Sequence, residues 1–252
     1  MYLRLFAEKI TMNGSLQTIS LFDLSLAFIP VLITIFILFK WSLRSSYALY
    51  AVFRMLVQLL LIGYFLTYIF KSDSSAIVLL ILLVMVVASS WIALGTVTER
   101  RLELYKHAFI SMAIGGGFTL LLITEGVMAL DPWYSPQSVI PIAGMIFANA
   151  MNSVSLAAER LSAEVSRGVD YDSARKIALQ SSLIPVINSL FAVGLVSLPG
   201  MMTGQILSGV SPLIAARYQI MVMCMVFGAS GITTALFLVM VKSMFIKQQV
   251  ND

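Results

Sequence analysis

The chain has 252 residues, of which 60% are hydrophobic and only 11% carry a charge. Soluble domains are closer to half apolar and a quarter charged, so a single water-soluble core cannot hold this much apolar surface. The formal net charge of +4 comes from dispersed basic residues, which argues against nucleic-acid binding. One cysteine excludes an internal disulfide, and one histidine excludes a multi-histidine metal site within the chain. The composition predicts a protein embedded in lipid.

Seven apolar stretches of about the length that crosses a bilayer follow one another along the chain. They cover roughly 21–39, 47–70, 76–97, 108–130, 137–157, 183–209 and 218–241. Residues 1–20 are predicted to form an interfacial segment, because charged side chains interrupt their apolar positions. We therefore expect an all-α, polytopic membrane protein with one transmembrane domain over 21–241 and a tail over 242–252.

The basic residues between these stretches predict the orientation of the chain. One side of the membrane would carry Lys40, Arg44, Arg100, Arg101, Lys106, Arg160, Arg167, Arg175, Lys176, Lys242 and Lys247. The other side would carry only Arg4, Lys9, Lys71 and Arg217. The side richer in Lys and Arg is normally cytoplasmic, so we expect the N-terminus outside and the C-terminus in the cytoplasm.

The second stretch contains two polar residues, Arg54 and Gln58, which share a helical face with Tyr47 and Tyr50. Polar groups within lipid are costly and therefore mark candidate positions on a translocation pathway. Snorkelling of the Arg54 guanidinium to the headgroups is the favoured interpretation, and a substrate contact is the alternative.

The fourth stretch contains three consecutive glycines, 115–117, and a carboxylate, Glu125. The glycines lack the GxxxxGK[ST] pattern of a nucleotide loop, so they predict close helix packing instead. Glu125 lies about a turn from the outer end of its helix, where a solvated rim carboxylate is favoured over a proton or cation site.

The fifth stretch, "SVIPIAGMIFANAMNSVS", aligns Met145, Asn149 and Asn152 on one helical face. Hydrogen bonds between helices and a polar lining of a pathway are both open interpretations of these side chains.

The sixth stretch is interrupted by "LPG", and Pro199 and Gly200 predict a hinge or a cavity wall because proline removes a helical hydrogen bond. Further pathway candidates flank this hinge and are Asn188, Met201, Met202 and Gln205. Methionine thioethers are ligands for Cu(I), but without a Cys or His partner the sequence favours packing.

The longest hydrophilic stretch, 158–182, predicts a helix, a turn and a second helix. Gly168 would end the first helix, and Asp170 or Asp172 would cap the next. Such a turn has a shape on which a cytoplasmic partner protein could dock.

Three segments carry a resemblance to a known family. "RMLVQLLLIGYFLTYIF" (54–70), "VIPIAGMIFANAM" (139–151) and "VGLVSLPGMMTGQILSGVSPLIAARYQIMV" (193–222) resemble motifs of FetB-type ABC permeases. The resemblance implies a multi-pass permease subunit of the cell (inner or plasma) membrane that pairs with a separate ATPase and exports iron. It also implies ATPase-coupling residues in the 158–182 turn, for which the candidates are Glu164, Arg167, Gly168, Asp170 and Asp172.

The energy source would lie outside this chain, which lacks the Walker A lysine motif. We expect no cofactor bound by the chain itself, ATP on the partner subunit, and a homodimer that encloses the pathway within membrane lipid. An ion- or proton-coupled secondary carrier is the alternative, although only Glu125 is a plausible intramembrane acid. A membrane-embedded enzyme is disfavoured because no nucleophile–base or paired-carboxylate pattern is present.

Overall fold

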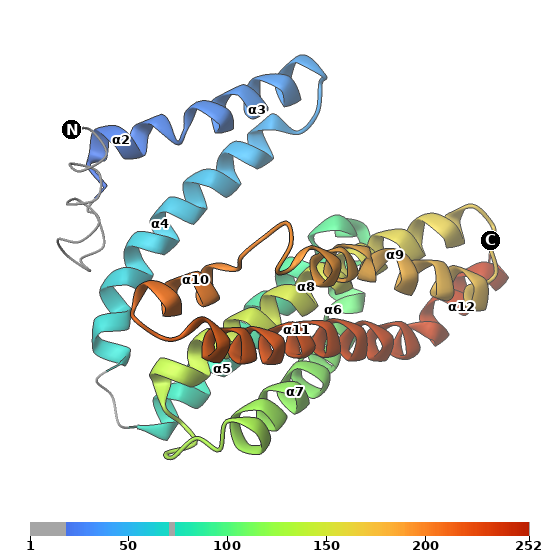
Figure 1. Ribbon diagram of the computed structural model, residues 1–252. Coiled ribbons are helices and arrows are strands. Elements are labelled where there is room, and N and C mark those ends of the chain that lie inside the picture. Colours follow the sequence, from blue (N-terminus) through green and yellow to red (C-terminus); the bar gives the residue numbers. More distant parts are fainter. Residues whose placement is uncertain (1–18, 71–73, 252) are drawn as a thin grey trace. The chain divides into compact units, whose positions relative to one another are not determined.

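The protein is described by a computed structural model that covers residues 19–70 and 74–251. Every regular element within these residues is helical, which confirms the all-α prediction (Figure 1). The chain divides into two compact units, one ending at Lys71 and the other beginning at Ser72. The predicted interfacial segment lies almost wholly outside the described residues.

The first unit consists of α2 (Leu21–Leu26), α3 (Ile29–Lys40) and α4 (Ser45–Ile69). Ser20 caps α2 by accepting a hydrogen bond from the Asp23 backbone N–H, and α3 begins with a proline in its first turn. None of these helices has a buried residue within the unit. Their apolar side chains are therefore free to meet lipid or another protein surface.

The second unit begins with the long α5 helix and continues through shorter helical segments to the start of α8. Its first elements are α5 (Ser75–Ala93), η1 (Leu94–Thr96), η2 (Thr98–Arg100), α6 (Arg101–Ser111), η3 (Met112–Gly116), α7 (Gly117–Leu121) and η4 (Leu122–Val127). Its later elements are α8 (Pro136–Ser166), α9 (Tyr171–Ala192), α10 (Gly200–Leu207), α11 (Pro212–Met240) and α12 (Lys242–Asn251).

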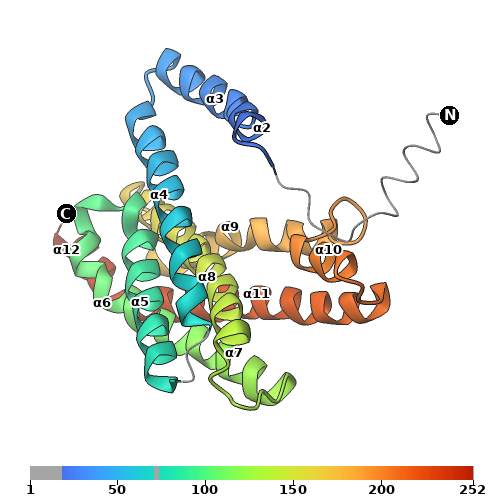
Figure 2. The same cartoon turned by 90° about the vertical axis from the view of Figure 1, so that its left-hand side faces the viewer.

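The α8 helix forms the centre of the second unit and packs against α5, α9 and α11 (Figures 1 and 2). Its buried face repeats every three or four residues, as a helix surrounded by others requires. Ile142, Ile146, Ala150 and Val154 lie on that face and are at most 3% exposed. The hydrophobic core of this unit is therefore organised around α8.

The predicted triple-glycine packing is confirmed at two of the three positions. A Cβ atom added to Gly115 would lie 2.5 Å from Thr233 Oγ1 and 2.8 Å from Thr233 Cα in α11, and one added to Gly116 would lie 2.6 Å from the Phe147 ring in α8. Gly117 has no such neighbour within 4 Å. The absence of side chains at 115 and 116 thus allows η3 to approach both helices closely.

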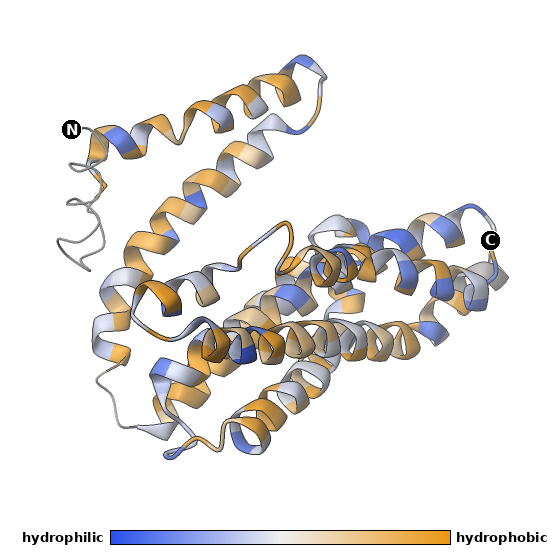
Figure 3. Ribbon diagram, viewed as in Figure 1, coloured by the Kyte–Doolittle hydropathy of each residue, from blue (hydrophilic) through white to orange (hydrophobic). Residues whose placement is uncertain are grey.

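Six helical segments in the described part of the chain are long and apolar enough to cross a membrane. They are Leu21–Lys40, Ser45–Ile69, Ser75–Thr96, Thr98–Val127, Pro136–Ser166 and Pro212–Met240. In the second unit, hydrophilic residues gather around the connection between α8 and α9 and near α12 (Figure 3). The fold is that of a polytopic helical membrane protein, with a polar end at the α8–α9 connection.

The remaining predicted stretch, 183–209, is divided between α9 and α10. The helix ends at Ala192, before the Pro–Gly pair, because Val193 is extended and Gly194 adopts φ +84°. Val193 N–H bonds to the Ser189 carbonyl, and the N–H groups of Leu195, Val196 and Ser197 bond to the Ala192 carbonyl. Pro199 then occupies the N-cap position of α10 and makes no side-chain hydrogen bond there. The interruption runs from Val193 to Pro199, so it is longer than the "LPG" motif alone suggests.

Candidate functional site

The connection between α8 and α9 is a tight turn, as the sequence predicts. Gly168 has φ +84°, a conformation that favours glycine, and its N–H donates to the Val165 carbonyl at 2.9 Å. The Val169 N–H donates to the Glu164 carbonyl at 3.1 Å. These bonds satisfy the last carbonyls of α8, so the turn ends one helix and directly positions the next.

Asp170 is the N-cap of α9, which settles the choice between Asp170 and Asp172 for that role. Its Oδ1 accepts a hydrogen bond from the Ser173 backbone N–H at 3.0 Å. Hydrogen bonds from the Ser173 hydroxyl and backbone hold the pKa of Asp170 below its ordinary value. The cap is therefore charged at neutral pH, where it suits the positive end of the helix dipole.

A buried carboxylate, Glu164, lies one turn before Gly168. Its side chain is 8% exposed, and its Oε1 accepts from Arg160 Nη2 at 2.8 Å and from Arg167 Nη1 at 3.2 Å. The two guanidinium groups compensate a charge that burial alone would make costly. Glu164 thus organises the last turn of α8, while Arg167 keeps most of its surface exposed.

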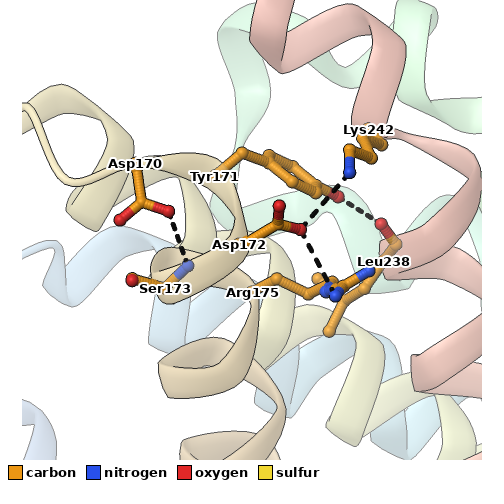
Figure 4. Close-up of polar contacts among 7 residues, drawn as sticks. All are labelled: Asp170, Tyr171, Asp172, Ser173, Arg175, Leu238 and Lys242. Carbon is orange, nitrogen blue, oxygen red and sulfur yellow. Dashed lines mark hydrogen bonds and ion pairs between the residues drawn. The ribbon is translucent and has the colours of Figure 1, made fainter.

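The first turn of α9 is joined to the junction between α11 and α12 (Figure 4). The buried Tyr171 hydroxyl donates a hydrogen bond to the Leu238 carbonyl in the last turn of α11, where intrahelical donors run out. Asp172 Oδ1 lies 3.3 Å from Lys242 Nζ and 3.3 Å from Arg175 Nη2. This cluster ties three helices together at the polar end of the unit.

A cavity of about 190 Å³ lies at the same end of the unit. It is lined by Thr96, Val97, Thr98, Glu99, Arg100, Leu104, Ser162 and Phe245. The Arg100 guanidinium lies 4.4 Å from the centre of the Phe245 ring, an arrangement typical of a cation–π contact. The polar end therefore presents both a structured turn and a recess beside it.

Replacement of Tyr171 by phenylalanine tests the tie between α9 and α11. Loss of the bond to Leu238 should lower the unfolding free energy by about 1 kcal/mol. Burial raises the pKa of Tyr171 to about 12 from 10.0, so its folded form resists ionisation. Its contribution is complete below pH 10 and is lost as the pH rises towards 12.

Thermal and denaturant unfolding of the detergent-solubilised chain between pH 8 and 12 would measure both effects. The native chain should lose stability above pH 10 more steeply than Tyr171→Phe. Tyr134→Phe, which removes a hydroxyl in the connection before α8, should retain the native profile. Identical profiles for all three chains would contradict the assigned contact.

The predicted pathway residues are divided between the two units. Arg54 and Gln58 are exposed on α4 in the first unit. In the second unit, Asn149 Nδ2 donates to the Met145 carbonyl of its own helix at 2.8 Å, whereas Asn152 is exposed on α8. The Asn149 bond is therefore intrahelical, unlike the interhelical bond considered from sequence.

The pathway candidates around the helix interruption differ in their surroundings. Asn188 and Met201 are exposed, whereas Met202 lines a cavity between the end of α9, α10 and α11. Gln205 is partly buried, and its Oε1 lacks a hydrogen-bond partner. The hinge role of Pro199 and Gly200 stays a prediction.

Sequence reasoning missed the residues that complete both regions. Tyr171 meets Leu238, and Asp172 meets Lys242, only through tertiary packing, 67 and 70 positions apart along the chain. Gln219, Met223 and Cys224 join Met202 at the cavity. The spacing of 219 and 223 on one helical face was the available signal for this second group.

The all-helical fold with its six long apolar segments defines a multi-pass membrane protein. The chain belongs to a family described as the uncharacterised protein family UPF0014, whose model matches residues 21–246. No solved structure matches the chain.

Three relatives confirm the resemblance that the sequence motifs suggest. The chain is 36% identical to the probable iron export permease protein FetB of Escherichia coli, covering 84% of this chain and 86% of that protein. It is 36% identical to a UPF0014 membrane protein of Synechocystis, slr1647, over 72% of this chain and 76% of the relative. It is also 31% identical to the protein ALUMINUM SENSITIVE 3 of Arabidopsis thaliana, over 82% of this chain and 81% of that protein.

Proposed function

We propose that this chain is the membrane-spanning permease subunit of an ABC transporter that exports metal ions with energy from a separate ATPase. The observation that carries the proposal is the α8–α9 turn, which is exposed at its tip and tied at its base to α11 and α12. A partner that pushes on such a turn would move several helices together. The Escherichia coli relative, named as a probable iron export permease, makes iron the first metal to test.

The proposed topology has the N-terminus outside and the C-terminus in the cytoplasm. In this arrangement α8 brings the chain to the cytoplasmic side, and α11 does so again. The chain between them must return outward through α9 and α10, which supplies a seventh, broken crossing. The basic residues around the α8–α9 turn are consistent with a cytoplasmic location for the polar end.

A homodimer of the permease is part of the proposal. Leu195, Val196 and Leu198 are 91%, 84% and 63% exposed on the non-helical segment between α9 and α10. Within the hydrocarbon region, irregular backbone is tolerated only where it is covered by protein or lines a water-filled cavity. A second copy would supply that cover and would enclose a pathway with the first, since symmetric pairs are the commonest oligomers.

The test is to purify the chain with the cytoplasmic ATPase that binds it and to reconstitute both in vesicles. ATP hydrolysis would be measured with and without Fe(II) or Fe(III), and the mass of the complex would give its stoichiometry. We expect two permease chains per complex and hydrolysis that rises with metal. A stable complex that ignores iron would remove the iron assignment, whereas no ATPase partner and transport driven by a proton gradient would favour a secondary carrier.

A further inference from the structure

A second cavity of the second unit has an unusual set of side chains. It has a volume of about 340 Å³ and lies between the end of α9, α10 and α11. Its walls are Leu190, Val193, Gly194, Met202, Ala216, Gln219, Ile220, Met223 and Cys224. Apart from one amide, these walls are apolar or carry sulfur.

Three sulfur atoms come from two different helices. Met202 belongs to α10, and Met223 and Cys224 belong to α11. The sequence alone favours packing for the methionines because no cysteine or histidine is visibly near them. The fold supplies that missing partner, since Cys224, the chain's single cysteine, lines the same cavity as Met202. Thiolate and thioether sulfur are the ligands that Cu(I) prefers.

Gln219 is an independent sign that the cavity takes a ligand. Its side chain lines the cavity and is only 5% exposed, yet its Oε1 has no hydrogen-bond partner. Buried polar atoms are nearly always paired, and an unpaired one calls for an ion, a water or another group. Rotation of the Gln219 amide towards a ligand in the cavity would give its oxygen a partner that the folded chain does not provide.

We propose that this cavity binds a soft monovalent cation, Cu(I) or Ag(I), through Met202, Met223 and Cys224, with the Gln219 amide at its edge. Hard trivalent ions such as Fe(III) prefer several oxygen ligands, which these walls do not offer. Binding is a property of the chain alone and needs no ATPase. A role for the bound ion as cargo rests on the proposed transport function.

The single cysteine makes the test direct, because thiol labelling reports on Cys224 alone. The full chain in detergent is exposed to Cu(I) buffered with bathocuproine disulfonate, and the rate of maleimide modification is measured. The thiol, which is exposed on the spanning helix α11, should be labelled by a membrane-permeant maleimide without metal and be protected as free Cu(I) rises. The double variant Met202→Leu/Met223→Leu keeps the side-chain volume close to native, so the fold should persist.

We expect the double variant to need about 10–100-fold more free Cu(I) for half-protection, since even outer-shell partners matter by that factor. Met221→Leu, a partly buried methionine of α11 that does not line the cavity, is the matched control and should behave as the native chain does. Fe(III) should give no protection. Equal half-protection in all variants would overturn the site, because the thiol would then bind metal unaided. If the double variant is not labelled even without metal, the free Cu(I) needed for half-protection would be compared between the native chain and Met223→Leu alone. An unchanged value in that single variant would likewise overturn the site.

The outcome is separable from that of the proposed function. A chain that protects Cys224 through its thioethers but recruits no ATPase would keep the metal site and remove the ABC assignment. A chain that stimulates an ATPase but shows no thioether-dependent protection of Cys224 would keep the ABC assignment and remove the metal site.

Discussion

Gly115→Ala should destabilise the folded chain by about 1–3 kcal/mol, the range for overpacking a close contact. The added methyl group would lie within 2.9 Å of both backbone N and Cα of Thr233, as well as 2.5 Å from its hydroxyl oxygen. Backbone atoms cannot turn aside as a flexible side chain can, so η3 and α11 would have to separate. The midpoint of thermal unfolding in detergent measures the loss.

Gly117→Ala is the matched control, two residues along the same helical segment. Nothing lies within 4 Å of the position where its Cβ would be added. Alanine is favoured over glycine in a helix interior by about 1 kcal/mol, so this variant should be as stable as the native chain or more so. If Gly115→Ala had the same midpoint of thermal unfolding as Gly117→Ala, α11 would be able to move away from the added methyl group at little cost, and the prediction would be wrong.

Gly168→Val should uncouple ATP hydrolysis from the permease if the α8–α9 turn carries the coupling. Valine at φ +84° is strained by its branched Cβ, and the left-handed conformation costs an ordinary residue about 1–2 kcal/mol. The turn would relax by shifting Asp170 and the start of α9. In the reconstituted complex we expect metal-stimulated hydrolysis to fall by about tenfold, the effect of 1.4 kcal/mol.

Gly168→Asn separates backbone strain from the mere presence of a side chain. Asparagine tolerates the left-handed region, and no atom within 4 Å of Gly168 would meet its Cβ. Its hydrolysis should therefore stay close to native. Equal metal-stimulated ATP hydrolysis in the Val and Asn variants would show that coupling does not depend on the backbone conformation of this turn.

The parts of the fold that sequence predicts correctly are local. Gly168 and Asp170 mark the end of α8 and the start of α9 because their signals act within a few residues. The glycines at 115 and 116 likewise predict a close approach between helices, although not that Thr233 and Phe147 are the partners.

Other features depend on long-range packing or on competing local signals. Pro199 is a strong helix breaker, yet the helix has already ended at Ala192 because Gly194 takes a left-handed conformation. The meeting of Tyr171 with Leu238 and that of Met202 with Cys224 join residues from different helices. No pattern with a period of a helix turn encodes such pairs, so they become visible only in three dimensions.

The bond from Tyr171 to α11 has a mechanical consequence. The same helix carries Leu238 at one end and Gln219 beside the sulfur-lined cavity, and both lie within the unbroken span Pro212–Met240. At 1.5 Å per residue these two positions are about 28 Å apart, so a tilt of α11 at one end would be amplified at the other. A tilt of about 6° around the Tyr171 anchor would swing the cavity end by about 3 Å on this length. That displacement is comparable to the diameter of a water molecule. A small movement of the α8–α9 turn would therefore be enough to change the shape of the sulfur-lined cavity at the other end of α11.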